Sequence, residues 1–122
     1  MYKEKENPLR EKSYAYALAI VKICRQIQKT EKEYVLTKQL LRSSTSIGAN
    51  IEEAIGGQSS KDFVHKISIS YKEARESHYW LRLMRDSEII EKSIANELIA
   101  LVEELLRIMT SIQKTMKSKL NS

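Results

Sequence analysis

The sequence predicts an all-α fold, an antiparallel, up-and-down, left-handed four-helix bundle. One proline and three glycines in 122 residues leave little of the turn chemistry that sheets require. Apolar residues recur at steps of three and four along most of the chain. Short polar breaks divide this pattern into four segments, near residues 8–29, 32–56, 60–86 and 91–118. A chain of 122 residues has the usual length of one domain, so residues 1–122 are expected to form a single domain.

The first segment has a clear start signal. Asn7 is a favourable N-cap, and Pro8 follows at the first helical position, where a missing N–H costs nothing. The predicted core stripe of this helix is Tyr14, Leu18, Val21, Cys24 and Ile27. Because Cys24 is the only cysteine, it cannot form an intramolecular disulfide, and we expect it to act as a small core hydrophobe.

The second segment is expected to open with a capping box. Thr30 and Glu33 stand three residues apart, and a threonine and a glutamate at this spacing can each satisfy a free N–H of the other. The helix is expected to stop at the Gly56-Gly57 pair. Its predicted core stripe is Leu36, Leu40, Ser44, Ile47, Ile51 and Ile55.

The third and fourth segments both show heptad spacing. Ser59 and Asp62 mark the start of the third segment, whose stripe alternates steps of four and three without a break: Phe63, Ile67, Ser70, Ala74, Ser77, Leu81 and Met84. The fourth segment is acidic in its first half and basic at its end, as the helix macrodipole favours, and its final residues KSKLNS are expected to fray. Its predicted stripe is Ile94, Leu98, Leu101, Leu105, Ile108 and Ile112.

Small and hydroxylated residues fill the stretch SSTSIGANIEEA at positions 43–54. At 100° per residue, Ser44 and Ala54 face the core, Gly48 lies at its flank, and the opposite face of the helix is small. A glycine in a helix interior costs about 1 kcal/mol relative to alanine, and close approach of another backbone would offset this cost. We therefore expect one flank to pack tightly within the bundle and the outer face to contact another subunit. An undistinguished small-residue surface is the alternative.

A second stripe on the third segment is rotated by about 100° or more from its core direction. It consists of Ile69, Glu73, Glu76, Trp80 and Leu83, with Tyr79 beside it. It predicts either a wide contact within the bundle or an oligomer interface, where aromatic residues are enriched. We predict a homo-oligomer, and its candidate interface residues are Arg42, Thr45, Ser46, Ala49, Asn50, Glu53, Ile69, Glu73, Glu76, Tyr79, Trp80 and Leu83. For Asn50 and Glu53 we expect structural bonds to neighbouring backbone or to Arg and Lys across an interface, rather than ligand binding.

The net charge of +5 permits contact with nucleic acid. In an antiparallel bundle, one end would gather Lys3 and Lys5 together with six nucleic-acid candidates: Arg10, Lys12, Lys61, Lys114, Lys117 and Lys119. The chain has no base-reading motif, so any binding should have weak sequence specificity. Ordinary solvated lysine and arginine faces are the alternative, and so is a protein partner with no nucleic-acid role.

The residues predict no catalytic, cofactor-binding or metal site. A dimetal centre in a four-helix bundle takes Glu-x-x-His from two helices and a glutamate from each of the others. The nearest match here is Asp62-x-x-His65, and His65 points away from the seam. The serines lack a recognisable base, His78 is expected to be a hydrogen-bonding residue, and no small-molecule substrate is evident. No apolar run approaches the roughly 18 residues that span a bilayer, so we expect no membrane insertion and a cytoplasmic location.

Two stretches carry a family resemblance: LLRSSTSIGANIEEA and QSSKDFVHKISISYKEARESHYWLRLM. They closely resemble the four helix bundle protein family, also called the 23S rRNA intervening-sequence protein or S23 family, and the resemblance extends over nearly the whole chain. Its most specific parts are residues 45–51, 62–63, 72–74 and 79–81. The chain departs from the commoner pattern at Ala54, where the family has a glycine, so the end of the second helix stays open by a turn or less.

The resemblance implies a small bacterial protein that forms an up-and-down bundle and can assemble as a homopentamer. A related branch resembles the accessory variability protein of diversity-generating retroelements, a basic pentamer that partners a reverse transcriptase and nucleic acid. The resemblance implies no enzymatic activity and no cofactor. Despite one family name, it does not imply a ribosomal subunit.

Overall fold

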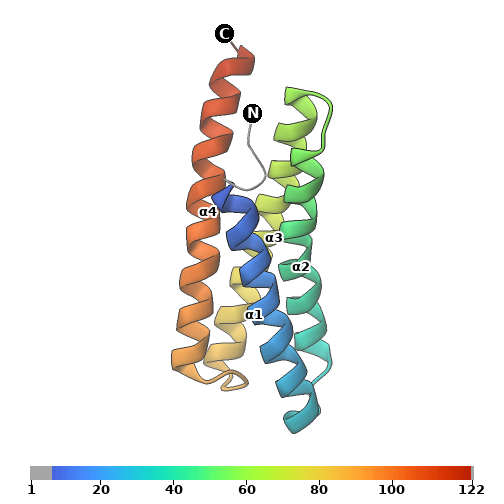
Figure 1. Cartoon of the computed structure of the whole chain (residues 1–122). Coiled ribbons are helices and arrows are strands. Elements are labelled where there is room, and N and C mark those ends of the chain that lie inside the picture. The colour runs from blue at the N-terminus through green and yellow to red at the C-terminus, as the bar shows by residue number, and fades with distance from the viewer. Residues whose placement is uncertain (1–6, 122) are drawn as a thin grey trace.

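The computed structural model describes residues 7–121, which form four helices in an antiparallel bundle (Figure 1). Their bounds are Pro8–Glu31 for α1, Val35–Ile55 for α2, Ser60–Asp86 for α3 and Lys92–Asn121 for α4. Each helix packs against the next along the chain, and α4 closes the bundle against α1. The predicted all-α four-helix bundle is confirmed.

Two of the predicted helix starts are confirmed by their capping bonds. The side chain of Asn7 accepts a hydrogen bond from the backbone N–H of Arg10 at 3.1 Å, with Pro8 at the first helical position. At the start of α3, the Ser59 hydroxyl accepts from the backbone N–H of Asp62 at 3.1 Å. In both cases a side-chain oxygen satisfies a donor that has no partner within the helix.

The capping box predicted at Thr30 and Glu33 is wrong. Thr30 lies inside α1, where its hydroxyl donates to the carbonyl oxygen of Gln26 at 2.9 Å. The chain turns at Lys32, which adopts the left-handed conformation with φ 58°. Glu33 still caps α2, but it does so alone, because its carboxylate accepts from the backbone N–H groups of three residues at 2.9–3.0 Å: Val35, Leu36 and Thr37.

The bonds at this cap also set the charge state of Glu33. Partial burial acts to raise the pKa of its carboxyl group, but the three backbone N–H donors outweigh burial and hold the pKa below its usual range. The carboxylate therefore neutralises the positive end of the α2 dipole.

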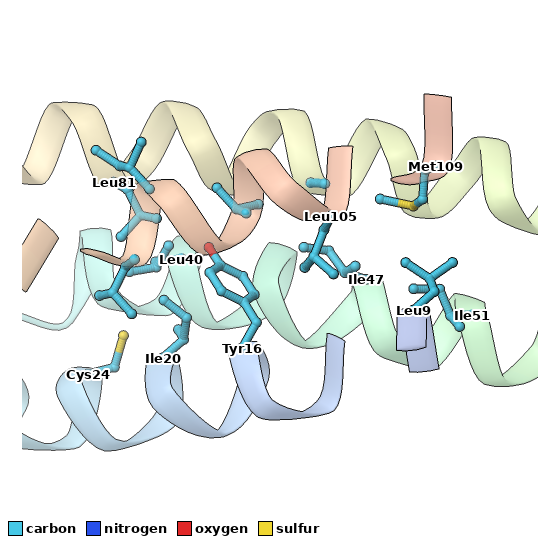
Figure 2. Packing of buried hydrophobic residues seen from close by; sticks show 14 of the residues in the cluster. Leu9, Tyr16, Ile20, Cys24, Leu40, Ile47, Ile51, Leu81, Leu105 and Met109 are labelled. Atoms are coloured by element: carbon cyan, nitrogen blue, oxygen red, sulfur yellow. The ribbon is translucent and has the colours of Figure 1, made fainter. Parts of the chain in front are cut away.

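The core stripe of α3 is confirmed at every predicted position, from Phe63 to Met84. The predicted stripe of α1 is wrong in its first half, because Tyr14 is 70% exposed and Leu18 is 46% exposed. The observed α1 core runs through Leu9, Ser13, Tyr16, Ile20, Cys24 and Ile27 (Figure 2). The predicted burial of Cys24 is therefore confirmed.

The stripe of α4 differs from the prediction in the same way. Ile94 is 36% exposed and Leu101 is 43% exposed, whereas Leu98 and Leu105 are buried as expected. The buried positions of α4 are Ala95, Leu98, Ile99, Val102, Leu105 and Met109. Both α1 and α4 carry two overlapping apolar stripes, and packing against the other helices selects one of them. The predicted fraying also differs, since α4 continues to Asn121.

A layer of hydroxyl groups crosses the middle of the core. The phenolic oxygen of Tyr16 lies 2.5 Å from Oγ of Ser77, which lies 2.8 Å from Oγ of Ser44. Seven residues before Ser77 on α3, the Ser70 hydroxyl donates to the carbonyl oxygen of Ile47 at 2.9 Å. The small serines on α2 and α3 leave room for the Tyr16 ring, which enters the core from α1 between Ile20 and Leu105 (Figure 2). This fit explains why Tyr16 is buried in place of Tyr14.

The expected close packing on one flank of α2 involves Gly48 and α1. A Cβ atom added to Gly48 would lie 3.5 Å from Oγ of Ser13, an ordinary van der Waals distance. At Gly57 the space is much tighter, because a Cβ atom would lie 2.5 Å from Oδ2 of Asp62 and 3.2 Å from the carbonyl oxygen of Ala54. A side chain at Gly57 would therefore need the Asp62 carboxylate to swing aside and the Ala54 carbonyl group to shift by a few tenths of an ångström, whereas Gly48 has room for a methyl group. Across residues 7–121, none of the helices is both long and apolar enough to cross a membrane.

Candidate assembly and nucleic-acid surfaces

Four of the candidate interface residues form a bonded network between α2 and α3 within one subunit. Arg42 forms ion pairs with Glu73, at 3.2 Å, and with Glu76. The indole N–H of Trp80 donates to Oε2 of Glu76 at 2.9 Å, and the Trp80 ring is half-buried against the core. Hydrogen bonds from Arg42 and then from Trp80 lower the pKa of Glu76, so its carboxylate stays ionised at neutral pH. This part of the second stripe is a wide contact within the bundle.

The hydroxyl and amide groups on the outer side of α2 bond to their own helix. Thr45 donates to the carbonyl oxygen of Leu41, and Ser46 donates to that of Arg42, both at 2.7 Å. The side-chain amide of Asn50 donates to the carbonyl oxygen of Ser46 at 2.8 Å, the kind of backbone bond expected for this residue. Because these groups fold back on the helix, they leave a smooth outer surface around Thr45 and Ala49, both of which are exposed.

The other candidate residues of α3 differ in their exposure. Ile69 is half-buried, whereas Tyr79 and Leu83 are exposed. The Tyr79 ring meets the Trp80 ring edge-on, with 5.1 Å between centroids, and the guanidinium of Arg82 lies 5.9 Å from its centre. Across the α2–α3 turn, Lys66 pairs with Glu53 at 2.7 Å, so Glu53 has a basic partner within its own subunit.

Four exposed apolar residues were not predicted as surface candidates, because their helical spacing matched that of a core stripe. They are Tyr14 and Leu18 on α1, and Ile94 and Leu101 on α4. The sequence contained one signal for this exposure: each of the two helices carries two apolar stripes, and only one of them can face the core. On α1, the alternative stripe through Leu9, Tyr16 and Ile20 has the same helical spacing and would have left Tyr14 and Leu18 outside.

Four of the nucleic-acid candidates, Lys61, Lys114, Lys117 and Lys119, lie where α3 begins and α4 ends (Figure 1). The predicted gathering of all six is wrong for Arg10 and Lys12, which lie on the first turns of α1, where Lys12 is level with the middle of α4. Both are paired within the subunit, Arg10 with Glu52 at 2.7 Å and Lys12 with Glu104 at 3.0 Å. The others are exposed: Lys61, Lys114, Lys117 and Lys119. Lys3 and Lys5 lie outside the described residues.

A surface hollow of about 570 Å³ lies between the start of α3 and the end of α4. Phe63, Ile112 and Met116 contribute apolar atoms to it, and Ser60, Thr115 and Lys119 contribute polar ones. The hollow therefore combines apolar atoms with a single lysine.

The described residues offer little catalytic chemistry. Cys24 is fully buried, and this burial, with a smaller effect from the Glu33 carboxylate, raises the pKa of its thiol to about 12. The thiolate needed for nucleophilic attack is therefore not populated at neutral pH. Nε2 of His78 lies 3.0 Å from Oε2 of Glu103, a contact that joins α3 to α4. Among residues 7–121, no cluster of three or more histidine, cysteine or acidic side chains could hold a metal ion.

Comparison with known families agrees with this architecture. The family model of the 23S rRNA-intervening sequence protein matches residues 5–111 of the chain. The chain belongs to this family. A search of curated proteins found no match.

A solved structure is also similar to the chain. It is a protein of unknown function from the S23 ribosomal protein family of Bacteroides thetaiotaomicron. The two chains share 40% sequence identity with a TM-score of 0.85, over 87% of this chain and 98% of that one.

In this member of the 23S rRNA-intervening sequence protein family, the segment 45–51 forms the middle of α2. Its inward residues Ile47 and Ile51 are fully buried, its flanking Gly48 meets α1, and its outer residues Thr45 and Ala49 are exposed. The segment therefore serves helix packing on two sides and leaves a third side open to contact.

Proposed function

We propose that the protein is a non-enzymatic homo-oligomer that binds nucleic acid weakly and without sequence specificity through repeated basic patches. One observation supports this best. Lys61, Lys114 and Lys117 are exposed at neighbouring helix ends, and none of them forms an ion pair within the described part of the chain. Their ammonium groups are thus available to phosphates. A pentamer is the stoichiometry that the family resemblance implies.

Assembly would turn a weak patch into a useful one. A single subunit offers few phosphate contacts, but copies held in one assembly bind the same strand with a high effective concentration. Each phosphate contact releases counterions, so binding should weaken steeply with salt. If each of the three lysines meets one phosphate of duplex DNA, the logarithm of the binding constant should fall with a slope of about −2.7 per subunit against the logarithm of the salt concentration.

The experiment compares two double variants that remove the same charge. Binding of a fluorescent RNA and of a duplex DNA is measured by anisotropy at about 50 mM salt and across a salt series. Lys114→Gln with Lys117→Gln should weaken binding at least about tenfold and make the slope less negative by about 1.8. Lys38→Gln with Lys72→Gln, which lie elsewhere on the surface, should have little effect.

Two outcomes would reject this proposal. If the wild-type protein failed to bind either probe at tens of micromolar, the nucleic-acid role would be excluded. If light scattering at micromolar concentration gave only the 14.2 kDa of one chain, the homo-oligomer would be excluded. Equal weakening by both double variants would place the binding surface elsewhere.

The alternative function is a structural or protein-interaction scaffold with no nucleic-acid role. The observation that favours it is the exposed aromatic and apolar pair Tyr79 and Leu83 on α3, next to the smooth outer side of α2. Two of the six basic candidates are also already paired with glutamates. Assembly without nucleic-acid binding would favour the scaffold.

A further inference from the structure

The side of α1 that faces away from the core carries a straight stripe of five residues. Tyr14, Leu18, Lys22, Arg25 and Lys29 follow one another at steps of four, four, three and four, which keeps them on one helix face. All five are exposed. The three basic residues form no ion pair within the described part of the chain. The first two residues of this stripe are apolar and the last three are basic.

The first half of α4 carries a stripe of the opposite charge. Ile94, Glu97 and Leu101 follow at steps of three and four, and all three are exposed. Glu97 forms no ion pair among residues 7–121, and neither does Glu91 just before the helix. This α4 stripe therefore presents two apolar side chains and an unpaired carboxylate.

The ion pair between Lys12 and Glu104 shows how α1 and α4 align along the bundle axis. Because the helices are antiparallel, Leu18 is level with position 98 and Lys22 with position 94. Leu101 and Glu97 each lie three residues from those levels, about 4.5 Å along the axis. A single small shift therefore brings Leu18 of one copy opposite Leu101 of another and, at the same time, Lys22 opposite Glu97.

The small residues of α2 lie beside the α1 stripe. The contact between Gly48 and Ser13 places Ala49 near the level of Tyr14 along the bundle axis. Thr45 lies one turn nearer the start of α2, near the level of Leu18. Both side chains are short, and the Thr45 hydroxyl bonds to its own helix. A foreign helix can therefore approach α2 closely while it packs against Tyr14 and Leu18.

We propose that the α1–α2 surface of one copy, formed by Tyr14, Leu18, Lys22, Thr45 and Ala49, receives the α4 stripe of a second copy. Leu18 packs on Leu101, and Lys22 pairs with Glu97. The two surfaces differ, so the contact is heterologous, and repetition of it with closure generates a ring. This proposal rests on the homo-oligomer proposed above and assigns both halves of its contact.

The test uses two variants that each disable one half of the contact. Leu18→Asp places a charge in the α1–α2 surface, and Leu101→Asp places one in the α4 stripe. Both positions are exposed, so each variant should keep the helical circular dichroism of the wild type. Each variant alone should be monomeric by light scattering, because every contact in its ring would include the disabled half.

Mixing the two variants gives the decisive result. The intact α4 stripe of Leu18→Asp can still bind the intact α1–α2 surface of Leu101→Asp, so the mixture should form a one-to-one dimer of twice 14.2 kDa. A self-complementary contact, or a contact elsewhere, cannot produce this dimer. A mixture that stayed monomeric would overturn the proposal.

A matched control separates the surfaces. Leu120→Asp introduces the same charge at an exposed leucine near the end of α4, outside both proposed surfaces, and should leave the wild-type assembly intact. If Leu120→Asp dissociated the assembly while Leu18→Asp did not, the contact would lie near the end of α4 and this inference would fail, although the homo-oligomer would stand. A monomeric wild type would instead reject the homo-oligomer itself.

Charge reversal tests the predicted pair directly. Lys22→Glu and Glu97→Lys should each weaken the assembly, measured as a rise in the dissociation constant of at least about tenfold. The double variant should recover most of that loss, because it restores an opposite-charge pair in reversed order. Losses that add without recovery would show that the two side chains do not meet.

Discussion

The phenolic oxygen of Tyr16 lies 2.5 Å from Oγ of Ser77, and both residues are buried in the middle of the bundle. The same serine oxygen lies 2.8 Å from Oγ of Ser44, so three helices share one chain of hydroxyl groups. Burial raises the pKa of Tyr16 to about 12, although its bonds to the serines act to lower it. The hydroxyl therefore stays protonated and can donate across the physiological pH range.

This chain of bonds predicts unequal costs for its removal. Tyr16→Phe should lower the free energy of unfolding by about 1 kcal/mol, because Ser77 keeps Ser44 as a partner. Ser77→Ala should cost more, about 1–3 kcal/mol, because it leaves the buried Tyr16 hydroxyl without this partner. Urea unfolding at a fixed protein concentration measures both. The prediction would be contradicted if Ser77→Ala were the milder change.

Gly48→Ala should stabilise the protein. The position is inside α2, where alanine is favoured over glycine by about 1 kcal/mol, and the added methyl group would sit 3.5 Å from Oγ of Ser13. Gly57→Ala should be less favourable than Gly48→Ala, because its methyl group would displace the flexible Asp62 carboxylate and would lie 3.2 Å from the Ala54 carbonyl oxygen. Thermal melts of the two variants against the wild type give the signs. A destabilised Gly48→Ala variant would mean that α1 and α2 cannot yield even to an ordinary contact.

The cap at Glu33 predicts a loss of stability in acid. Its folded pKa is lowered, so its contribution is fully present above the unfolded pKa of about 4.3 and is lost as the pH falls through the folded pKa. Glu33→Gln should lose stability at neutral pH and should show a shallower decline between about pH 5 and pH 3. Urea midpoints across this range measure the effect. Glu88→Gln, which removes an exposed carboxylate with no such bonds, should keep the wild-type slope.

Ala49→Glu should weaken assembly without weakening the subunit. The residue is exposed on the smooth side of α2, so a glutamate there costs the isolated helix only about 0.5 kcal/mol or less. In the proposed contact it would place a long charged side chain against an apolar part of the neighbour. Light scattering over a dilution series should show dissociation at higher concentration than for the wild type. Gln39→Glu, on another side of α2, is the control, and an unchanged assembly in Ala49→Glu would remove α2 from the contact.

Local signals were sufficient for several elements. Asn7 and Ser59 were recognisable as caps because the bond of an N-cap reaches only two or three residues along the chain. The α3 stripe was predictable in full because one set of small and apolar residues stands at unbroken heptad spacing, from Phe63 to Met84. The start of α2 was misplaced because Thr30 and Glu33 have the right spacing for a capping box, whereas α1 continues through Thr30.

The candidate surfaces were predictable only in part. The outward direction of Thr45 and Ala49 followed from the helical period. The ion pairs that join Arg42 to Glu73 and Glu76 depend on how far apart α2 and α3 lie, which no local pattern contains. They show that part of the predicted subunit interface also makes contacts within one subunit.

By itself, the sequence determined that this protein is a bundle of four helices and which face of α3 is buried, because helical periodicity and capping are local. Only the tertiary structure decided the faces of α1 and α4. Each of these helices carries two apolar stripes of similar strength, so its own residues do not distinguish core from surface. Shape complementarity decides which stripe of α1 is buried. The ring of Tyr16 fits the space left by the small side chains of Ser44 and Ser77, and its burial turns Tyr14 and Leu18 outward.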